Sequence, residues 1–139
     1  MPNKLEYLKM IQNIISRLAG NSFSMKGWSI ILISALFALA TKDTAKYLVV
    51  LAYFPAIAFW ALDGYFLYQE RLYRKWYDYV RQASDDELQI LNYSMNITPV
   101  LDQASWLGAM FSPTLRIFHG IIVFFFITPV ILYMFFVYP

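Results

Sequence analysis

The stretch Ile117 to Pro139, IFHGIIVFFFITPVILYMFFVYP, carries no formally charged residue. A helix rises ~1.5 Å per residue, so these 23 residues are long enough to cross the ~30 Å apolar core of a bilayer. A soluble domain of this size would interrupt such a run with polar residues. The stretch therefore predicts a transmembrane helix, and the rest of the chain has to fit a membrane protein.

The composition agrees with this class. Of 139 residues, 60% are hydrophobic and 14% are charged, whereas a soluble globular domain averages about 25% charged residues. The chain has no cysteine, which excludes disulfides, thiolate metal sites and cysteine nucleophiles. His119 is the single histidine, so one chain cannot form a multi-histidine metal site. We predict a single membrane domain over residues 1–139, without a metal or cofactor.

Two further apolar stretches precede the last one. Residues 24–41 include GWSIILISALFALA, and residues 47–68 read YLVVLAYFPAIAFWALDGYFLY with one charge, Asp63. The polar loop TKDTAK joins them. With a third span at 113–138, the pattern predicts an all-α membrane protein with three transmembrane helices.

The distribution of positive charge predicts the orientation of these spans. Nine of the 11 lysines and arginines fall on the side of the N-terminus and of residues 69–116; Lys42 and Lys46 fall on the other. Loops rich in Lys and Arg stay in the cytoplasm. We expect a multi-pass protein of the bacterial inner membrane, with the N-terminus inside and the C-terminus outside.

The cytoplasmic parts are predicted to be helical. Apolar residues recur at helical spacing over 4–19 and predict an amphipathic helix that ends at Gly20. In the cytoplasmic segment 69–112, the second span continues as a helix through QERLYRKWYDYVRQA, residues 69–83. Ser84 and Glu87 have the spacing of a capping box that opens another helix.

The start of the third span is also marked in the sequence. Residues 96–99, NITP, predict a loop, and Ser112-Pro113 predicts the N-terminus of the last helix. Pro129 lies inside that helix and is expected to kink it.

Enzyme motifs are absent. The chain contains no GxGxxG, P-loop, GxSxG or HExxH pattern, so we predict that it is not an enzyme. The acidic run at residues 85–87 suits the positive end of a helix dipole better than a metal site, because adjacent helical positions do not converge on one ion.

Asp63 has two interpretations. A charge in a membrane segment is costly and needs a polar partner or a water-filled path. Copies of Asp63 in an oligomer could form a ring that attracts cations at the cytoplasmic mouth of a pore. Alternatively, Asp63 pairs with Arg116 or His119 on the neighbouring span. His119 itself is interpreted as an interface residue, although its pKa range suits a proton switch.

Three spans cannot enclose a wide pore, so a channel requires an oligomer. The small-residue pairs Ser34 with Ala38 and Ala52 with Ala56 would let helices approach closely. A seven-residue repeat on the last helix predicts one face able to form an apolar gate; the alternative is ordinary lipid-facing surface. The repeat comprises Leu115, His119, Ile122, Phe126, Pro129, Tyr133 and Phe136. Our candidate pore and gate residues are Asp63, His119, Ile122, Phe126 and Pro129.

Residues 71–81, RLYRKWYDYVR, interleave cations with aromatic rings. A single-stranded nucleic-acid groove uses cations for phosphates and aromatic faces for stacking. The same composition is expected beside any span, where it can meet anionic lipid headgroups. The candidate ligand-binding residues are Arg71, Tyr73, Arg74, Lys75, Trp76 and Arg81.

Three segments carry a resemblance to a known family: KGWSIILISALFALA, YFPAIAFWALDGYFLYQERLYRKWYDYVR and FSPTLRIFHG. Over residues 10–138 the chain resembles small bacterial membrane proteins encoded in anti-phage defence loci, most closely the ion-channel effectors of Hailong systems. The resemblance implies a homo-oligomer, a tetramer, controlled by single-stranded DNA oligomers that a partner nucleotidyltransferase makes. Bound DNA would hold the channel shut, and its loss during infection would depolarise the membrane.

Other functions remain open. Related defence effectors respond to cyclic nucleotides instead of DNA. A holin-like or toxin-like membrane disruptor would need no ligand, and a membrane anchor for a soluble partner would conduct no ions.

Overall fold

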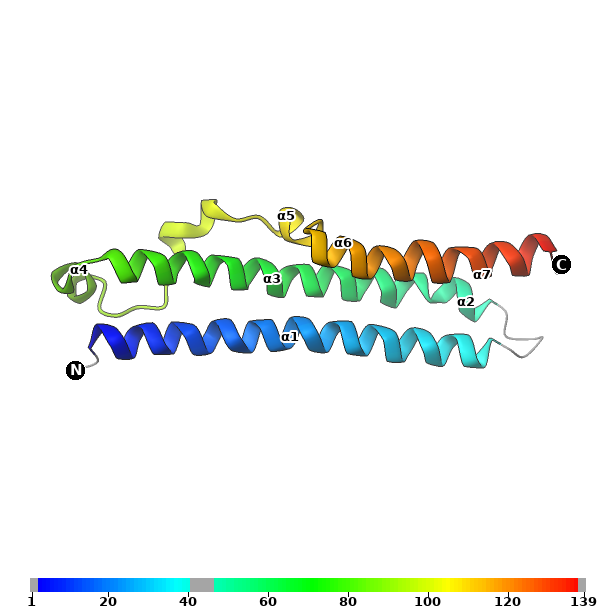
Figure 1. The fold of residues 1–139 in the computed structure, drawn as a ribbon, viewed down its shortest axis with the longest axis horizontal. Helices are drawn as coiled ribbons and strands as arrows, with labels where there is room; N and C mark the ends of the chain where they lie inside the picture. Colours follow the sequence, from blue (N-terminus) through cyan, green and yellow to red (C-terminus); the bar gives the residue numbers. More distant parts are fainter. Residues whose placement is uncertain (1–2, 41–46, 138–139) are drawn as a thin grey trace.

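The computed structural model describes residues 3–40 and 47–137, and every regular element in this part of the chain is a helix (Figure 1). In chain order the elements are α1 (Lys4–Leu39), α2 (Leu48–Leu51), α3 (Tyr53–Gln82), α4 (Asp85–Ile90), a 3₁₀ helix (Thr98–Gln103), α5 (Trp106–Met110), α6 (Pro113–Gly120), a π-helical segment (Ile121–Ile127), α7 (Thr128–Leu132) and a second π-helical segment (Tyr133–Val137).

Three helices are long and apolar enough to cross a membrane: Lys4–Leu39, Leu48–Gln82 and Pro113–Val137. This finding confirms the all-α class and the three apolar spans. The predicted span ends at Thr41 and Tyr138, and the loop with Lys42 and Lys46, lie outside the described residues.

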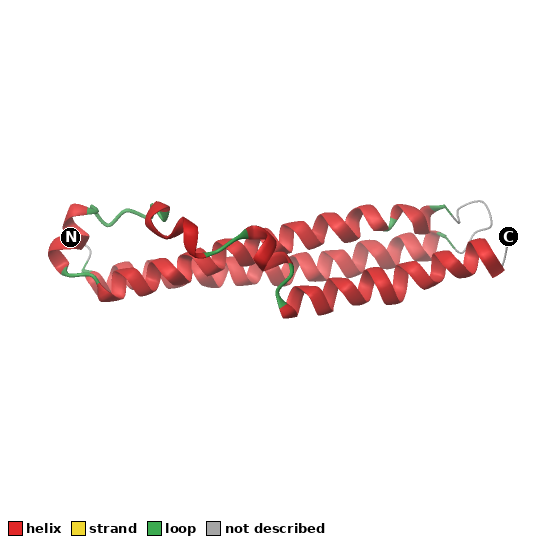
Figure 2. Ribbon diagram, turned by 90° about the horizontal axis from the view of Figure 1, so that it is seen from above, coloured by secondary structure: helices red, strands yellow, loops and turns green. Residues whose placement is uncertain are grey.

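The molecule is elongated and consists of two halves that differ in structure (Figures 1 and 2). In one half, α1, α3 and the last helical stretch run side by side; in the other, α1 and α3 continue as a pair beside α4 and the 3₁₀ helix. We call this second half the stalk, residues 3–20 and 68–105. The N-terminus lies at the stalk end and the C-terminus at the opposite end.

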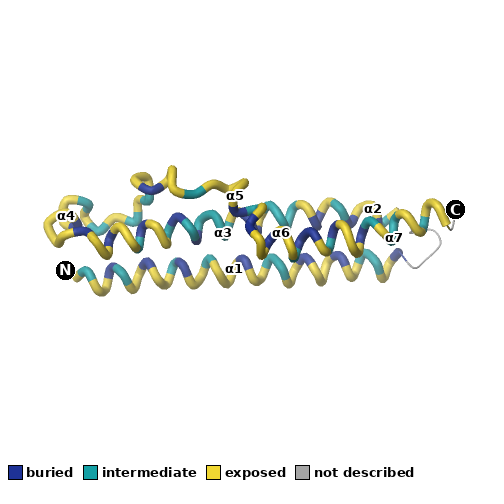
Figure 3. The backbone as a smooth tube through the Cα atoms, turned by 45° about the horizontal axis from the view of Figure 1, so that its top comes forward, coloured by how far each residue is buried: buried dark blue, intermediate teal, exposed yellow. Residues whose placement is uncertain are grey.

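The first helix does not end where the sequence predicted. The expectation that an amphipathic helix stops at Gly20 is wrong, because α1 continues without interruption for 36 residues, about 54 Å. Glycine costs a helix only about 0.5–1 kcal/mol relative to alanine. Packing against α3 outweighs that cost, and Figure 3 shows buried positions recurring along the whole of α1.

The second apolar stretch forms α2 and α3, which meet at Ala52. Pro55 explains the interruption, because it has no N–H to donate to the Leu51 carbonyl and its ring crowds that group. The predicted continuation of the helix beyond the span is confirmed, since α3 runs to Gln82. The capping box of Ser84 and Glu87 is confirmed as well, at the start of α4.

The stalk has its own hydrophobic core. Its buried members are Tyr7, Ile11, Ile15, Trp76, Val80, Ala83, Leu88 and Val100. After α4, Asn92 and Tyr93 adopt left-handed backbone conformations, with φ of 52° and 49°. This turn lets the Tyr93 ring pack edge-on against Tyr7 at a centroid distance of 5.4 Å, so tertiary packing offsets the backbone strain.

A short helix, α5, lies against α3 just before the third span begins. Gly64 makes this close contact possible, because a Cβ there would lie 2.3 Å from Met110 Cγ and 3.1 Å from Met110 Cα. Two indole groups add hydrogen bonds: Trp60 Nε1 donates to the Met110 carbonyl at 2.8 Å, and Trp106 Nε1 donates to the Ala61 carbonyl at 3.0 Å.

The last helix begins at Pro113, as predicted, with Ser112 at the N-cap position. Pro129 is accommodated by π turns: residues 121–127 are π-helical, and Thr128 Oγ1 donates to the Val123 carbonyl at 2.8 Å.

The predicted single face of the seven-residue repeat is wrong. Leu115 and His119 are buried and Ile122 is half-buried, whereas the members from Phe126 onward are exposed, because π turns take more residues per turn and shift the phase.

We expect Gly64→Ala to lower the free energy of unfolding by about 1–3 kcal/mol, since the new methyl group overlaps Met110. Gly20→Ala is the matched control, because nothing lies within 4 Å of a Cβ there and α1 is helical at this point. The control is expected to gain about 0.5–1 kcal/mol. Chemical unfolding in detergent micelles, followed by circular dichroism, measures both; an equal response of the two variants contradicts the packing of α5 on α3.

Candidate functional site: a buried charged cluster between three helices

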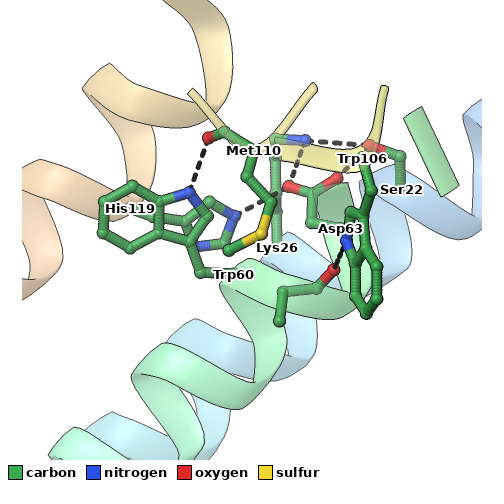
Figure 4. A network of polar contacts seen from close by, with 8 residues as sticks. Ser22, Lys26, Trp60, Asp63, Trp106, Met110 and His119 are labelled. Carbon is green, nitrogen blue, oxygen red and sulfur yellow. Dashed lines mark hydrogen bonds and ion pairs between the residues drawn. The ribbon is translucent and has the colours of Figure 1, made fainter. Parts of the chain in front are cut away.

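Asp63 is the centre of a polar cluster where the third span begins. It lies on α3 with 0% of its surface exposed, facing α1 on one side and α6 on the other (Figure 4). We call Ser22, Lys26, Asp63 and His119 the Asp63 cluster. The cluster brings together side chains that are up to 97 positions apart in the sequence, from Ser22 to His119.

Each oxygen of the Asp63 carboxylate is paired. Lys26 Nζ and His119 Nε2 each lie 2.7 Å from Oδ2. The Ser22 hydroxyl donates to Oδ1 and accepts a hydrogen bond from Lys26 Nζ at 3.0 Å. Ser22 and Lys26 are one helical turn apart on α1, so both can face the same carboxylate.

This arrangement decides between the interpretations of Asp63. The paired-acid interpretation is confirmed for His119 and wrong for Arg116, which is exposed and forms no ion pair with Asp63 among the described residues. A ring of Asp63 around a pore is not what the contacts favour, because the carboxylate is enclosed within one chain. Breaking a buried pair leaves an uncompensated charge, typically at a cost of about 3–5 kcal/mol.

Sequence reasoning missed Lys26 as a partner of Asp63. One signal was present: Ser22 and Ser29 lie in register with Ile15 on the buried stripe of α1, and Lys26 falls between them. The side chain of Lys26 is only 18% exposed.

His119 is the other basic member of the cluster and is 1% exposed. Its ring stacks on the Trp60 indole, with centroids 5.8 Å apart and an interplanar angle of 11°. Because Trp60 also donates to Met110, the cluster is connected to α5. No group of three or more His, Asp or Glu that could hold a metal occurs in residues 3–40 and 47–137. The ion pairs and hydrogen bonds of the cluster connect α1, α3 and α6.

The candidate ligand-binding residues lie on the stalk part of α3, and they divide into two groups. Trp76 is 1% exposed and donates to the Tyr7 hydroxyl at 3.0 Å, so the prediction that it stacks on a ligand is wrong. Its helical position faces α1, where a large ring fills the stalk core. The other five are exposed or half-buried: Arg71, Tyr73, Arg74, Lys75 and Arg81.

Two of these cations have acidic neighbours on the same helix. Arg74 pairs with Glu70 at 2.8 Å, and Arg81 lies 3.6 Å from Asp78. The Arg81–Asp78 pair is exposed and contributes about 0–1 kcal/mol. Glu70 is buried, but the Arg74 side chain is 59% exposed, so its guanidinium can still meet a phosphate. Arg71 and Lys75, one turn apart, form no ion pair within the described part of the chain.

Of the candidate pore and gate residues, His119 contacts Asp63, whereas Ile122, Phe126 and Pro129 lie further along the last helix. Ile122 and Phe126 help to line an apolar groove of about 320 Å³ between α1 and the last helix, and Pro129 is exposed. Of the two small-residue pairs, Ala52 and Ala56 are buried inside the chain, whereas Ser34 and Ala38 face outward.

A comparison with protein-family models, curated proteins and solved structures finds no match to this chain.

A double-mutant cycle tests the central ion pair. Lys26→Met removes one of the two basic partners of Asp63, and Asp63→Leu leaves Lys26 and His119 without their acid; each is expected to lower the free energy of unfolding by up to about 3–5 kcal/mol. The double variant is expected to lose less than the sum, with a coupling of about 0.5–3 kcal/mol. Chemical unfolding in micelles measures all three.

The control is Asp78→Asn, which removes an exposed pair and is expected to change stability by less than about 1 kcal/mol. Strict additivity of Lys26→Met and Asp63→Leu would show that the two side chains do not interact.

Proposed function

We propose that this protein is an ion-channel effector of anti-phage defence that assembles as a homo-oligomer in the bacterial inner membrane. In this proposal a nucleotide-derived ligand, single-stranded DNA oligomers, binds the cytoplasmic stalk and holds the channel closed. Loss of the ligand opens the channel and depolarises the membrane. The protein is then an effector and not an enzyme.

The observation that carries the proposal is the continuity of α1 and α3. Each of these helices runs from the stalk into the apolar half without interruption. A ligand that tilts or separates the two helices in the stalk therefore acts on the same two helices in the membrane. The Asp63 cluster lies between the two halves and fixes α1, α3 and α6 at one point, so it can serve as the pivot of that movement.

The surface of the stalk suits a polyanion. Arg71, Arg74, Lys75 and Arg81 lie along about three turns of α3, and none of them is buried. Tyr79 is exposed on the same segment. One face of its ring stacks on Trp76 at a centroid distance of 5.1 Å, and the other face can supply the stacking surface that Trp76 cannot. Cations with aromatic faces suit single-stranded nucleic acid, whose sequence need not be read.

The resemblance to effectors of Hailong systems supports the remaining parts of the proposal: a tetramer, DNA oligomers from a partner nucleotidyltransferase, and depolarisation during infection. One chain cannot enclose a pore with three spans. The outward small residues Ser34 and Ala38 offer a surface on which copies can approach closely. Exposed apolar side chains of the last helix, including Phe126, would then line or gate the pore.

Ion flux through proteoliposomes tests the proposal. We expect the purified protein to conduct and short single-stranded DNA to suppress the flux. The Arg71→Gln/Lys75→Gln variant should need at least about tenfold more DNA for the same suppression, because it loses two charge-assisted contacts. Its matched control is Lys9→Gln/Arg17→Gln, which removes the same charge from exposed positions of α1.

The outcomes separate the alternatives. Flux that ignores DNA would retain the pore and reject this ligand, in favour of a cyclic nucleotide or of a toxin without a ligand. Protein that is folded and inserted but never conducts would favour the membrane anchor.

A further inference from the structure

The helix α5 presents apolar side chains that nothing in the described chain covers. Trp106 is 47% exposed, Leu107 is 68% exposed, and Phe111, which directly follows the helix, is 55% exposed. A water-soluble segment does not usually gather three large apolar groups on one short helix. The proposed channel function assigns no role to this helix.

The position of α5 identifies what covers these side chains. It directly precedes the third span and lies against Ala61 and Gly64 of α3, beside the Asp63 cluster. On α3, this is where the apolar sequence gives way to the charged stalk. The exposed surface of α5 therefore continues the apolar surface of the spans at one margin of the membrane.

Aromatic contacts and charge agree with that margin. The Trp106 ring packs on Tyr65 at 5.8 Å, and Phe111 packs on Trp60 at 5.9 Å. Tryptophan and tyrosine concentrate at membrane–water interfaces. No charged residue lies between Asp102 and Arg116 in the sequence, and Arg116 is exposed in the first turn of α6, so its guanidinium can meet lipid phosphates.

Backbone groups of α5 have hydrogen-bond partners within the protein, which an environment with little water requires. Ser105 Oγ accepts the Gly108 N–H at 3.0 Å, and the Met110 carbonyl accepts the Trp60 indole N–H at 2.8 Å. The N–H of Phe111 bonds to the Leu107 carbonyl at 3.1 Å. Backbone groups in contact with lipid need such internal partners, because no water replaces them.

We propose that α5 and Phe111 form an interfacial membrane-binding element whose partner is the headgroup–acyl boundary of the phospholipid bilayer. Trp106, Leu107 and Phe111 insert there, while Met110 stays against α3. Since Trp60 contacts both Met110 and His119, this element connects the membrane interface to the Asp63 cluster.

The absence of cysteine from the sequence allows a direct test with single spin labels. Leu107→Cys is labelled with a nitroxide in nanodiscs of phosphatidylcholine and phosphatidylglycerol. Ile90→Cys, at an exposed stalk position, is the aqueous reference, and Phe124→Cys, exposed on the third span, is the lipid reference. Collision rates with oxygen, which partitions into lipid, are compared with those of a water-soluble nickel chelate.

We expect the oxygen-to-nickel ratio at Leu107 to be several-fold above that at Ile90 and below that at Phe124. A ratio equal to that at Ile90 places α5 in water and overturns the proposal. A label shielded from both reagents shows that protein, such as a second copy of the chain, covers α5, and also overturns it. Phe111→Cys repeats the test if Leu107→Cys does not insert. None of these readouts depends on ion flux, so the proposal can fail while the channel function stands.

Discussion

The requirement that a buried carboxylate be paired organises this structure. Asp63 lies about a third of the way along α3, and its charge has to be compensated by groups from other helices. Ser22 and Lys26 fix the position of α1 along α3, and His119 fixes the start of the third span. Apolar packing alone would tolerate a shift along a helix, because one aliphatic side chain can replace another. A charge with three specific partners does not tolerate it, so the cluster determines the register of all three helices.

The continuity of α1 and α3 follows from the same packing. Neither helix ends at the edge of the apolar half; the two continue as a pair into a stalk whose core contains Tyr7 and Trp76. The stalk is joined at its far end as well, where Lys4 Nζ donates to the Ala83 carbonyl at 2.9 Å. The pair is thus held together above and below the cationic surface of α3. Phosphates bound to that surface would act on two coupled helices and not on a loose segment.

Sequence reasoning succeeded where a signal is local. Pro113, the capping box at Ser84 and the three apolar runs were all readable, because each depends on neighbouring residues. It failed where tertiary contacts determine the length of a helix or the environment of a side chain. Gly20 was taken as a helix end, yet α3 supports α1 through it. Trp76 was assigned to a ligand because cations surround it in sequence, but the helical period turns its ring inward. Lys26 could not be assigned to Asp63, since the register between two helices does not appear in either one alone.

The strength of the Asp63 cluster limits how a channel built from this chain can open. Moving a two-state equilibrium from 1:99 to 99:1 requires about 5.5 kcal/mol of differential binding. Breaking one buried pair typically opposes such a change with about 3–5 kcal/mol. A transition that separated Lys26 or His119 from Asp63 would thus offset most of the binding free energy that a ligand can supply. A movement that keeps the cluster intact and pivots α1 and α3 about it meets no such opposition. If the chain is a channel, its opening is therefore better described as a movement of whole subunits relative to one another than as a separation of helices within one subunit.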